Sequence, residues 1–149
     1  MAERSFEDFK PGDRIETAAT VLGAREMIEF ARHYDPQAFH IDPLAAAAST
    51  YGGLIASGFL TMAVSFRLFW ETGSLGTANL AGLGFEEVTF SEAVRPGDSL
   101  RVSVEVESAR PSNSRPDRGI LALRYRSFNQ HGVEVLSFRC IHLVRRRAA

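Results

Sequence analysis

The sequence predicts an α+β fold in which an antiparallel sheet of five strands wraps around one long central helix. Residues 57–72 form the strongest predicted helix, because Ser57 can cap its start, Gly73 can end it, and the residues between them are apolar on nearly every side. A helix of that composition is expected to be buried. After Asn79 the apolar residues recur with a period of two, which is typical of half-buried strands. A buried helix followed by a run of strands describes a helix covered by one sheet.

The N-terminal part is expected to contribute one strand and one helix. A turn at 11–13 leads into a predicted strand over 14–21. A helix is expected over 24–34, because apolar residues recur there at the spacing i, i+3, i+4, i+7. This helix should end at Asp35, since Pro36 pushes the residue before it out of the helical region.

The segment 35–43 carries a carboxylate, Asp35, and an imidazole, His40. Prolines near both ends favour a loop over a helix, and a loop can point both side chains into one cleft. We expect them to face each other across a gap one water molecule wide, where they can move protons near neutral pH. A satisfied, half-buried histidine beside an ordinary turn is the alternative. A short helix is then expected over 44–48, capped by Asp42.

The second half of the chain is expected to supply the other four strands. Residues 100–107 alternate between apolar and polar, as in a strand with one buried face. Further strands are predicted over 84–90, 120–128 and 133–144, with a hairpin turn at 129–132. Such a sheet leaves one face to be covered, so a homodimer or higher homo-oligomer is expected.

Composition is ordinary for a soluble globular protein, with 45% hydrophobic and 23% charged residues, and we expect one domain over 1–149. The chain has neither an N-terminal apolar run nor a stretch of ~20 apolar residues, so no signal peptide and no membrane contact are expected. Cys140 is the single cysteine, which fits a cytoplasmic location and a place in the core. No metal-ligand spacing or phosphate loop occurs, and the arginines at 145–147 lack the wider basic face that nucleic-acid binding needs.

Several features together resemble the MaoC-like dehydratase family. They are Tyr34-Asp35, His40, Ser57-Gly58 at the start of the apolar helix, and the segment 82–88. The family includes the (R)-specific enoyl-CoA hydratases and adopts the hot-dog fold. Its usual motif has Asn-Pro two and three residues after the Asp; here Gln37-Ala38 stand in that place, and the Asp-to-His spacing is kept.

The resemblance implies a hydro-lyase that reversibly hydrates an enoyl thioester or dehydrates a 3-hydroxyacyl thioester. Asp35 and His40 would share the work on the water, and which of them is the base stays open. Backbone N–H groups near Gly58 are candidates for the thioester oxygen, because unpaired amides and the positive end of the helix dipole meet there, and glycine lets the thioester approach closely. Ser57 can both cap the helix and donate a hydrogen bond to Asp35; the alternative is that it only caps the helix.

Substrate contacts are harder to predict. Four apolar side chains are candidates for an acyl pocket: Phe39, Phe59, Met62 and Trp70. No bound cofactor is expected, since the substrate would be carried on coenzyme A or phosphopantetheine. Arg95, Arg115 and Arg118 are candidates for its phosphates. A hot-dog acyl-CoA thioesterase and a non-catalytic subunit that binds acyl thioesters are the alternative functions.

Overall fold

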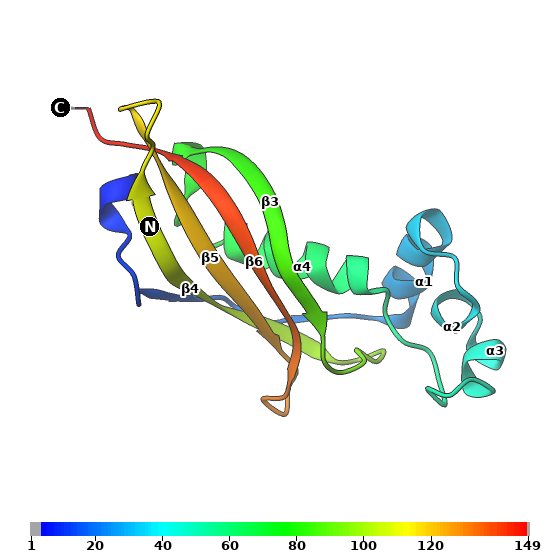
Figure 1. The fold of residues 1–149 in the computed structure, drawn as a ribbon. Coiled ribbons are helices and arrows are strands. Elements are labelled where there is room, and N and C mark those ends of the chain that lie inside the picture. The colour runs from blue at the N-terminus through cyan, green and yellow to red at the C-terminus, as the bar shows by residue number, and fades with distance from the viewer. Residues whose placement is uncertain (1–3, 149) are drawn as a thin grey trace.

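The computed structural model describes residues 4–148. Within them, six strands form one antiparallel sheet in the order β1-β4-β5-β6-β3, and β2 pairs with β4 beside this path (Figure 1). The strands are β1 (Arg14–Glu16), β2 (Thr20–Val21), β3 (Asn79–Phe90), β4 (Ser99–Pro111), β5 (Arg118–Phe128) and β6 (Glu134–Arg145). The predicted α+β class is therefore confirmed, with one strand more than expected.

The additional strand arises because the segment 14–21 is divided at Thr17. The Thr17 N–H donates to the Val102 carbonyl at 3.0 Å, while its hydroxyl accepts from the Val102 N–H at 2.9 Å. A side-chain oxygen thus takes the place of a backbone carbonyl in the ladder. Regular pairing resumes only in β2, where Thr20 lies opposite Leu100.

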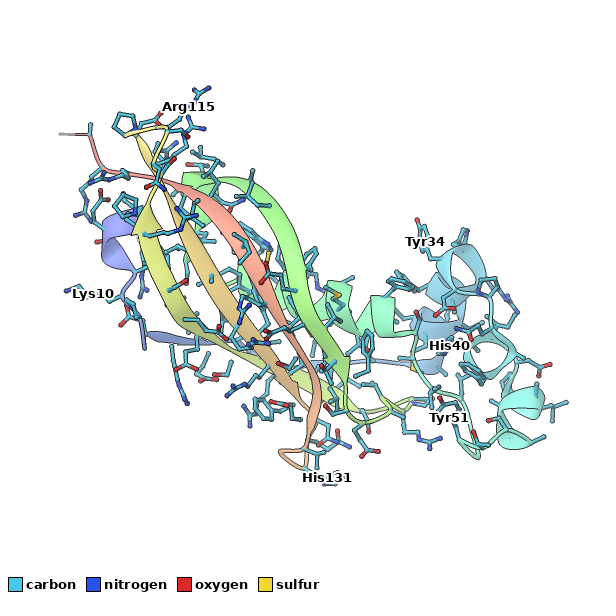
Figure 2. All side chains as sticks on the ribbon, viewed as in Figure 1. Lys10, Tyr34, His40, Tyr51, Arg115 and His131 are labelled. Atoms are coloured by element: carbon cyan, nitrogen blue, oxygen red, sulfur yellow. The ribbon has the colours of Figure 1, made fainter. Side chains whose placement is uncertain are left out.

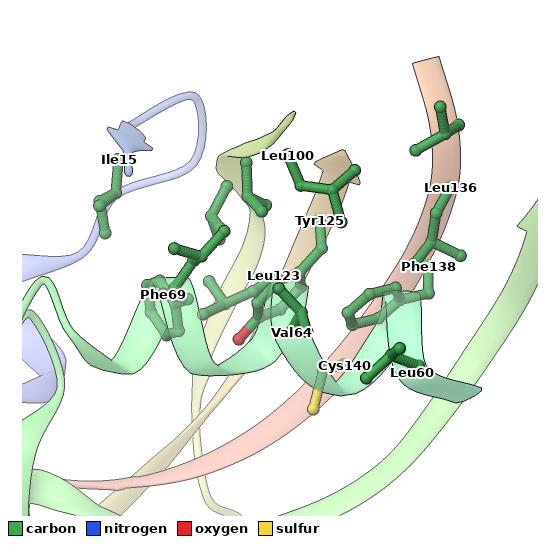
Figure 3. Packing of buried hydrophobic residues seen from close by; sticks show 14 of the residues in the cluster. Ile15, Leu60, Val64, Phe69, Leu100, Leu123, Tyr125, Leu136, Phe138 and Cys140 are labelled. Carbon is green, nitrogen blue, oxygen red and sulfur yellow. The ribbon is translucent and has the colours of Figure 1, made fainter. Parts of the chain in front are cut away.

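The long helix α4 (Gly58–Trp70) lies across the sheet, and the core fills the space between them (Figure 3). Leu60, Val64 and Phe69 of α4 are buried against strand residues. Those strand residues include Leu123, Tyr125, Leu136, Phe138 and Cys140. Cys140 is the small core residue that was predicted, and burial raises the pKa of its thiol to about 11.

The prediction that α4 is buried on all sides is wrong. Phe59, Ala63 and Arg67 follow one another at i, i+4 and i+8, and all three are exposed. One sheet covers only one side of a helix, which leaves this stripe facing outward. Phe59 is 65% exposed and so provides apolar surface on the outer side.

Three further helices lie beyond the end of the sheet, beside the start of α4 (Figure 1). They are α1 (Ala24–Tyr34), α2 (Ala38–Ile41) and α3 (Pro43–Ala47). The carboxylate of Asp42 caps α3 as predicted, accepting from the N–H groups of Leu44 and Ala45. Within residues 4–148, no helix has both the length and the apolar composition needed to cross a membrane.

The segment 35–43 contains a helical turn, α2, where a loop was predicted. Pro36 restricts Asp35 and Pro43 restricts Asp42, but neither restricts the four residues of α2. The two prolines therefore set the ends of the turn and leave its interior free to be helical. His40 consequently projects from a short helix.

Candidate active site

Asp35 and His40 are in direct contact. Asp35 ends α1 as its C-cap, and His40 lies on α2. The distance between His40 Nε2 and Asp35 Oδ2 is 3.2 Å, and the two side chains are 6% and 14% exposed. The predicted pair therefore forms, although the expected gap between its members is absent. A water molecule would have to lie beside the pair.

A backbone carbonyl orients the His40 ring. Its Nδ1 lies 2.8 Å from the carbonyl oxygen of Ile55. A carbonyl can only accept a hydrogen bond, so Nδ1 carries the proton and donates it. This assignment leaves Nε2, the atom that faces Asp35, as the nitrogen able to gain or lose a proton.

Two donors hold the Asp35 carboxylate. The Ser57 hydroxyl donates to Oδ2 at 2.7 Å, and the Gln37 side-chain amide donates to Oδ1 at 2.7 Å. Burial raises the pKa of Asp35, but hydrogen bonds from Gln37 and Ser57 and the charge of nearby His40 outweigh it. The pKa of this carboxyl therefore lies below its ordinary value, and the group is ionised at neutral pH.

Ser57 has both of the roles that were considered for it. Its Oγ accepts a hydrogen bond from the N–H of Phe59 at 3.2 Å and so caps α4. The same hydroxyl donates its proton to Asp35. The start of the long helix and the carboxylate are thus fixed to each other through one side chain.

The surroundings of Gly58 differ from expectation. Gly58 lines the same cavity as Asp35 and His40, and its N–H belongs to the first turn of α4, whose amides have no acceptor within the helix. The space beside its Cα, however, is filled by the ring of Phe90, which comes within 2.6 Å of the position that a Cβ would occupy. A Cβ at this position would displace the ring of Phe90. Because Phe90 is 55% exposed, its ring has room to move outward.

The pair opens into a cavity of about 420 Å³. Phe39 and Phe59 line it as predicted, whereas Met62 and Trp70 are not among its lining residues. Sequence reasoning missed the contributions of Tyr51, Phe90 and Glu92. No local pattern marks these residues, since the end of β3 and loops far apart in the sequence bring them to the cavity.

Of the three candidate arginines, only Arg95 lies near this end of the molecule. Its guanidinium Nη1 is 3.4 Å from the carbonyl oxygen of Gly53, in the loop that contributes Tyr51. Arg115 lies at the opposite end from His40 and Tyr51 (Figure 2). Arg118 forms an ion pair with Asp117 at 2.8 Å. Among residues 4–148, no three His, Cys, Asp or Glu side chains are grouped so as to hold a metal ion.

The sequence model of the MaoC like domain matches residues 8–119. The chain belongs to the MaoC-like domain family. A MaoC-like dehydratase from Rhodospirillum rubrum has 37% identity and a TM-score of 0.90, with 98% of this chain and 99% of that chain covered. The α4 helix wrapped by its sheet is the hot-dog fold that the resemblance implied.

Two further relatives extend the comparison. The uncharacterized protein YdeM of Bacillus subtilis (strain 168) is 33% identical over 95% of this chain and 99% of its own length. The mesaconyl-CoA hydratase of Cereibacter sphaeroides is 30% identical over 98% of this chain. This chain spans only 42% of the length of that hydratase.

Proposed function

We propose that this MaoC-like protein is a hydro-lyase that acts on an acyl thioester carried on coenzyme A or phosphopantetheine. It would add water to a 2-enoyl thioester and, in reverse, remove water from a 3-hydroxyacyl thioester. The observation that carries the proposal is the direct contact of Asp35 with His40 at the wall of a cavity that also reaches the first turn of α4. Membership of the family and the hydratase relative support it.

The proton transfers follow from the hydrogen bonds. A water beside the pair attacks C3 of the enoyl group and gives one proton to His40 Nε2, while Nδ1–H stays on the Ile55 carbonyl. The charged ring, stabilised by ionised Asp35, then returns a proton to C2. The lowered pKa of Asp35 makes its carboxylate a weak base, so in this mechanism Asp35 stays ionised and does not take the proton from the water. One water is consumed and no proton is gained or lost overall.

Charge develops on the thioester oxygen during the attack. The N–H of Gly58 and the positive end of the α4 dipole are suited to stabilise that charge in a partly enclosed site. Phe90 would have to turn away for the thioester to reach this amide, since its ring lies against Gly58. The side chains of Phe39 and Phe59 provide apolar contacts for the acyl part.

A homodimer fits the distribution of apolar surface. β3 is the end strand of the sheet path, and Leu83, Phe85 and Phe90 on it are each more than half exposed. Phe59 adds to this exposed apolar surface from α4. An unpaired apolar edge strand is a site for pairing with another chain, and a second copy would cover it.

The function is tested with a panel of 2-enoyl-CoA and 3-hydroxyacyl-CoA substrates. Hydration is followed by loss of enoyl absorbance, dehydration by its appearance, and hydrolysis by release of free thiol. The wild-type protein should show the first two activities, and Asp35→Asn should reduce them by about 10²–10⁴-fold without changing the thermal melt. Thiol release as the main activity would favour the thioesterase alternative. Binding without turnover across the panel would favour a non-catalytic subunit.

A further inference from the structure

Gln37 links Asp35 and His40 through three hydrogen bonds. Its backbone N–H donates to the Asp35 carbonyl at 2.8 Å, and its own carbonyl accepts from the His40 N–H at 2.9 Å. Its side-chain Nε2 donates to Asp35 Oδ1 at 2.7 Å. Only the third bond depends on the side chain, so substitution can remove it while the two backbone bonds remain.

The side chain of Gln37 is not used to cap a helix. Gln37 is the N-cap residue of α2, a position where a side chain often accepts from the first free N–H groups. No such bond forms there, whereas Asp42 at the start of α3 caps in the usual way. The exposed amide of Gln37 turns instead toward the carboxylate. This contrast indicates that the Gln37 side chain serves to hold the Asp35 carboxylate.

The two oxygens of Asp35 have different partners. Oδ2 accepts from Ser57 and faces His40, while Oδ1 accepts from Gln37. A carboxylate with donors on both oxygens cannot rotate about its Cβ–Cγ bond without breaking them. Loss of the Gln37 donor would leave the Ser57 hydroxyl as the one donor that resists this rotation, and would remove one hydrogen bond from the charged form.

On the basis of the proposed function, we propose that the Gln37 side chain is a positioning residue that keeps Asp35 charged and keeps its Oδ2 directed at His40. In the sequence, Gln37 stands where the usual family motif has asparagine. Gln37 also lines the cavity, and because its side-chain amide is bonded to Asp35, its effect should appear in the protonation of Asp35.

A consequence for pH dependence follows from the surroundings of Asp35. Burial raises the pKa of Asp35, and the Gln37 hydrogen bond is among the contacts that lower it. Removing that bond should therefore raise the pKa and move the acidic limb of the rate profile to higher pH. Among other titratable groups, His40 faces Asp35 from α2, while Tyr51 and Glu92 line the cavity from loops. Ser57 is retained as the second donor.

Three substitutions test the role. Gln37→Met keeps the length of the side chain but removes the donor, and should lower kcat about tenfold while shifting the acidic limb to higher pH. Gln37→Glu should shift it further, because a second negative charge would face Oδ1. Gln37→Asn keeps an amide donor on a shorter side chain. Its kcat and the position of its acidic limb should therefore lie between those of Gln37→Met and the wild type.

Gln130 provides a matched control. Its Nε2 donates to the Asp98 carboxylate at 2.8 Å, an exposed contact of the same kind, and its neighbour His131 lies away from His40 (Figure 2). Gln130→Met should leave kcat and the pH profile unchanged. The proposal is overturned if Gln37→Met has the wild-type profile, or if Gln130→Met produces the same change.

A direct titration separates this inference from the proposed function. The Asp35 carboxyl can be followed by NMR in the wild-type protein and in Gln37→Met, with no substrate present. A higher pKa in the variant supports the positioning role, even if the wild type hydrates no enoyl thioester and the proposed function fails. An unchanged pKa overturns the role, whatever the wild-type activity.

Discussion

Two buried histidines in this protein have opposite surroundings. His40 has Nδ1 on the Ile55 carbonyl and Nε2 against the Asp35 carboxylate, at the wall of the cavity. His142 on β6 has Nδ1 3.0 Å from Asn79 Oδ1 and Nε2 3.1 Å from the Tyr125 hydroxyl. Both rings are therefore fixed at both nitrogens, but only His40 has a charged partner.

The difference lies in the groups that surround each ring. Aromatic rings of Phe66, Phe69, Trp70 and Tyr125 surround His142, and burial lowers its pKa to about 4. Its Nδ1–H donates to Asn79, and its Nε2 accepts from the phenol, so the neutral ring is fully satisfied. Burial without a charged partner thus keeps the His142 ring neutral, as suits a structural role. A carboxylate beside the ring and an adjoining cavity are what suit His40 to proton transfer.

The largest effect should separate the two histidines by activity. His40→Gln should reduce hydration by about 10²–10⁴-fold, because it removes the group that exchanges protons in the proposed mechanism. His142→Gln should keep the wild-type rate in the folded protein, since His142 has no part in that mechanism. Both variants are assayed at equal folded concentration, established by circular dichroism. Equal losses of activity in the two would abolish the distinction.

The second effect concerns the pH dependence of stability. Between pH 6.5 and about 4, the unfolded chain binds a proton at His142 that the folded protein does not, so stability should fall as the pH falls. The loss should amount to roughly 3 kcal/mol near pH 4. The lowered pKa of Asp35 acts in the same direction, but only below its ordinary value of 3.8.

Urea unfolding at several pH values between 7 and 4.5 measures this dependence. His142→Gln should flatten the slope in that range, because it removes the titrating group. Asp35→Asn serves as the control and should leave the contribution of His142 intact. A slope that persists in His142→Gln would show that other groups cause it.

A smaller effect is expected from the phenol that holds His142. Tyr125→Phe leaves His142 Nε2 buried without its donor, at a cost of about 2 kcal/mol in the free energy of unfolding. Hydration activity should not change. Urea unfolding at pH 7 measures the cost, and a variant as stable as the wild type would mean that the contact contributes nothing.

The smallest stability effect should come from Ser57 beside the reactive pair. Ser57→Ala removes the cap of α4, at about 1 kcal/mol, together with one donor to Asp35, so hydration should fall as well. Ser65→Ala is the matched control on the same helix, because Ser65 is bonded to Ser127 at 2.6 Å and lies outside the lining of the cavity. It should lose stability but not activity. Equal activity in both variants would remove Ser57 from the site.

Some of the site could be predicted from the sequence. Pro36 ends α1 at Asp35, Asp42 caps α3, and Ser57 caps α4, as expected from residues next to each other in the chain. These features are local, because a proline or a capping hydroxyl acts within one turn. Period-two alternation likewise predicted the longest strands, and the Asp-to-His spacing indicated the pair.

Other features depended on contacts between distant segments, which local patterns do not specify. The Ile55 carbonyl selects the proton position on His40, and Phe90 from the end of β3 occupies the space beside Gly58. The sheet covers only one side of α4, so the apolar Phe59 faces outward. The sequence by itself thus determined most of the elements and the pairing of Asp35 with His40. Only the packing of segments far apart in the chain decided their orientation, their protonation and the cavity they share.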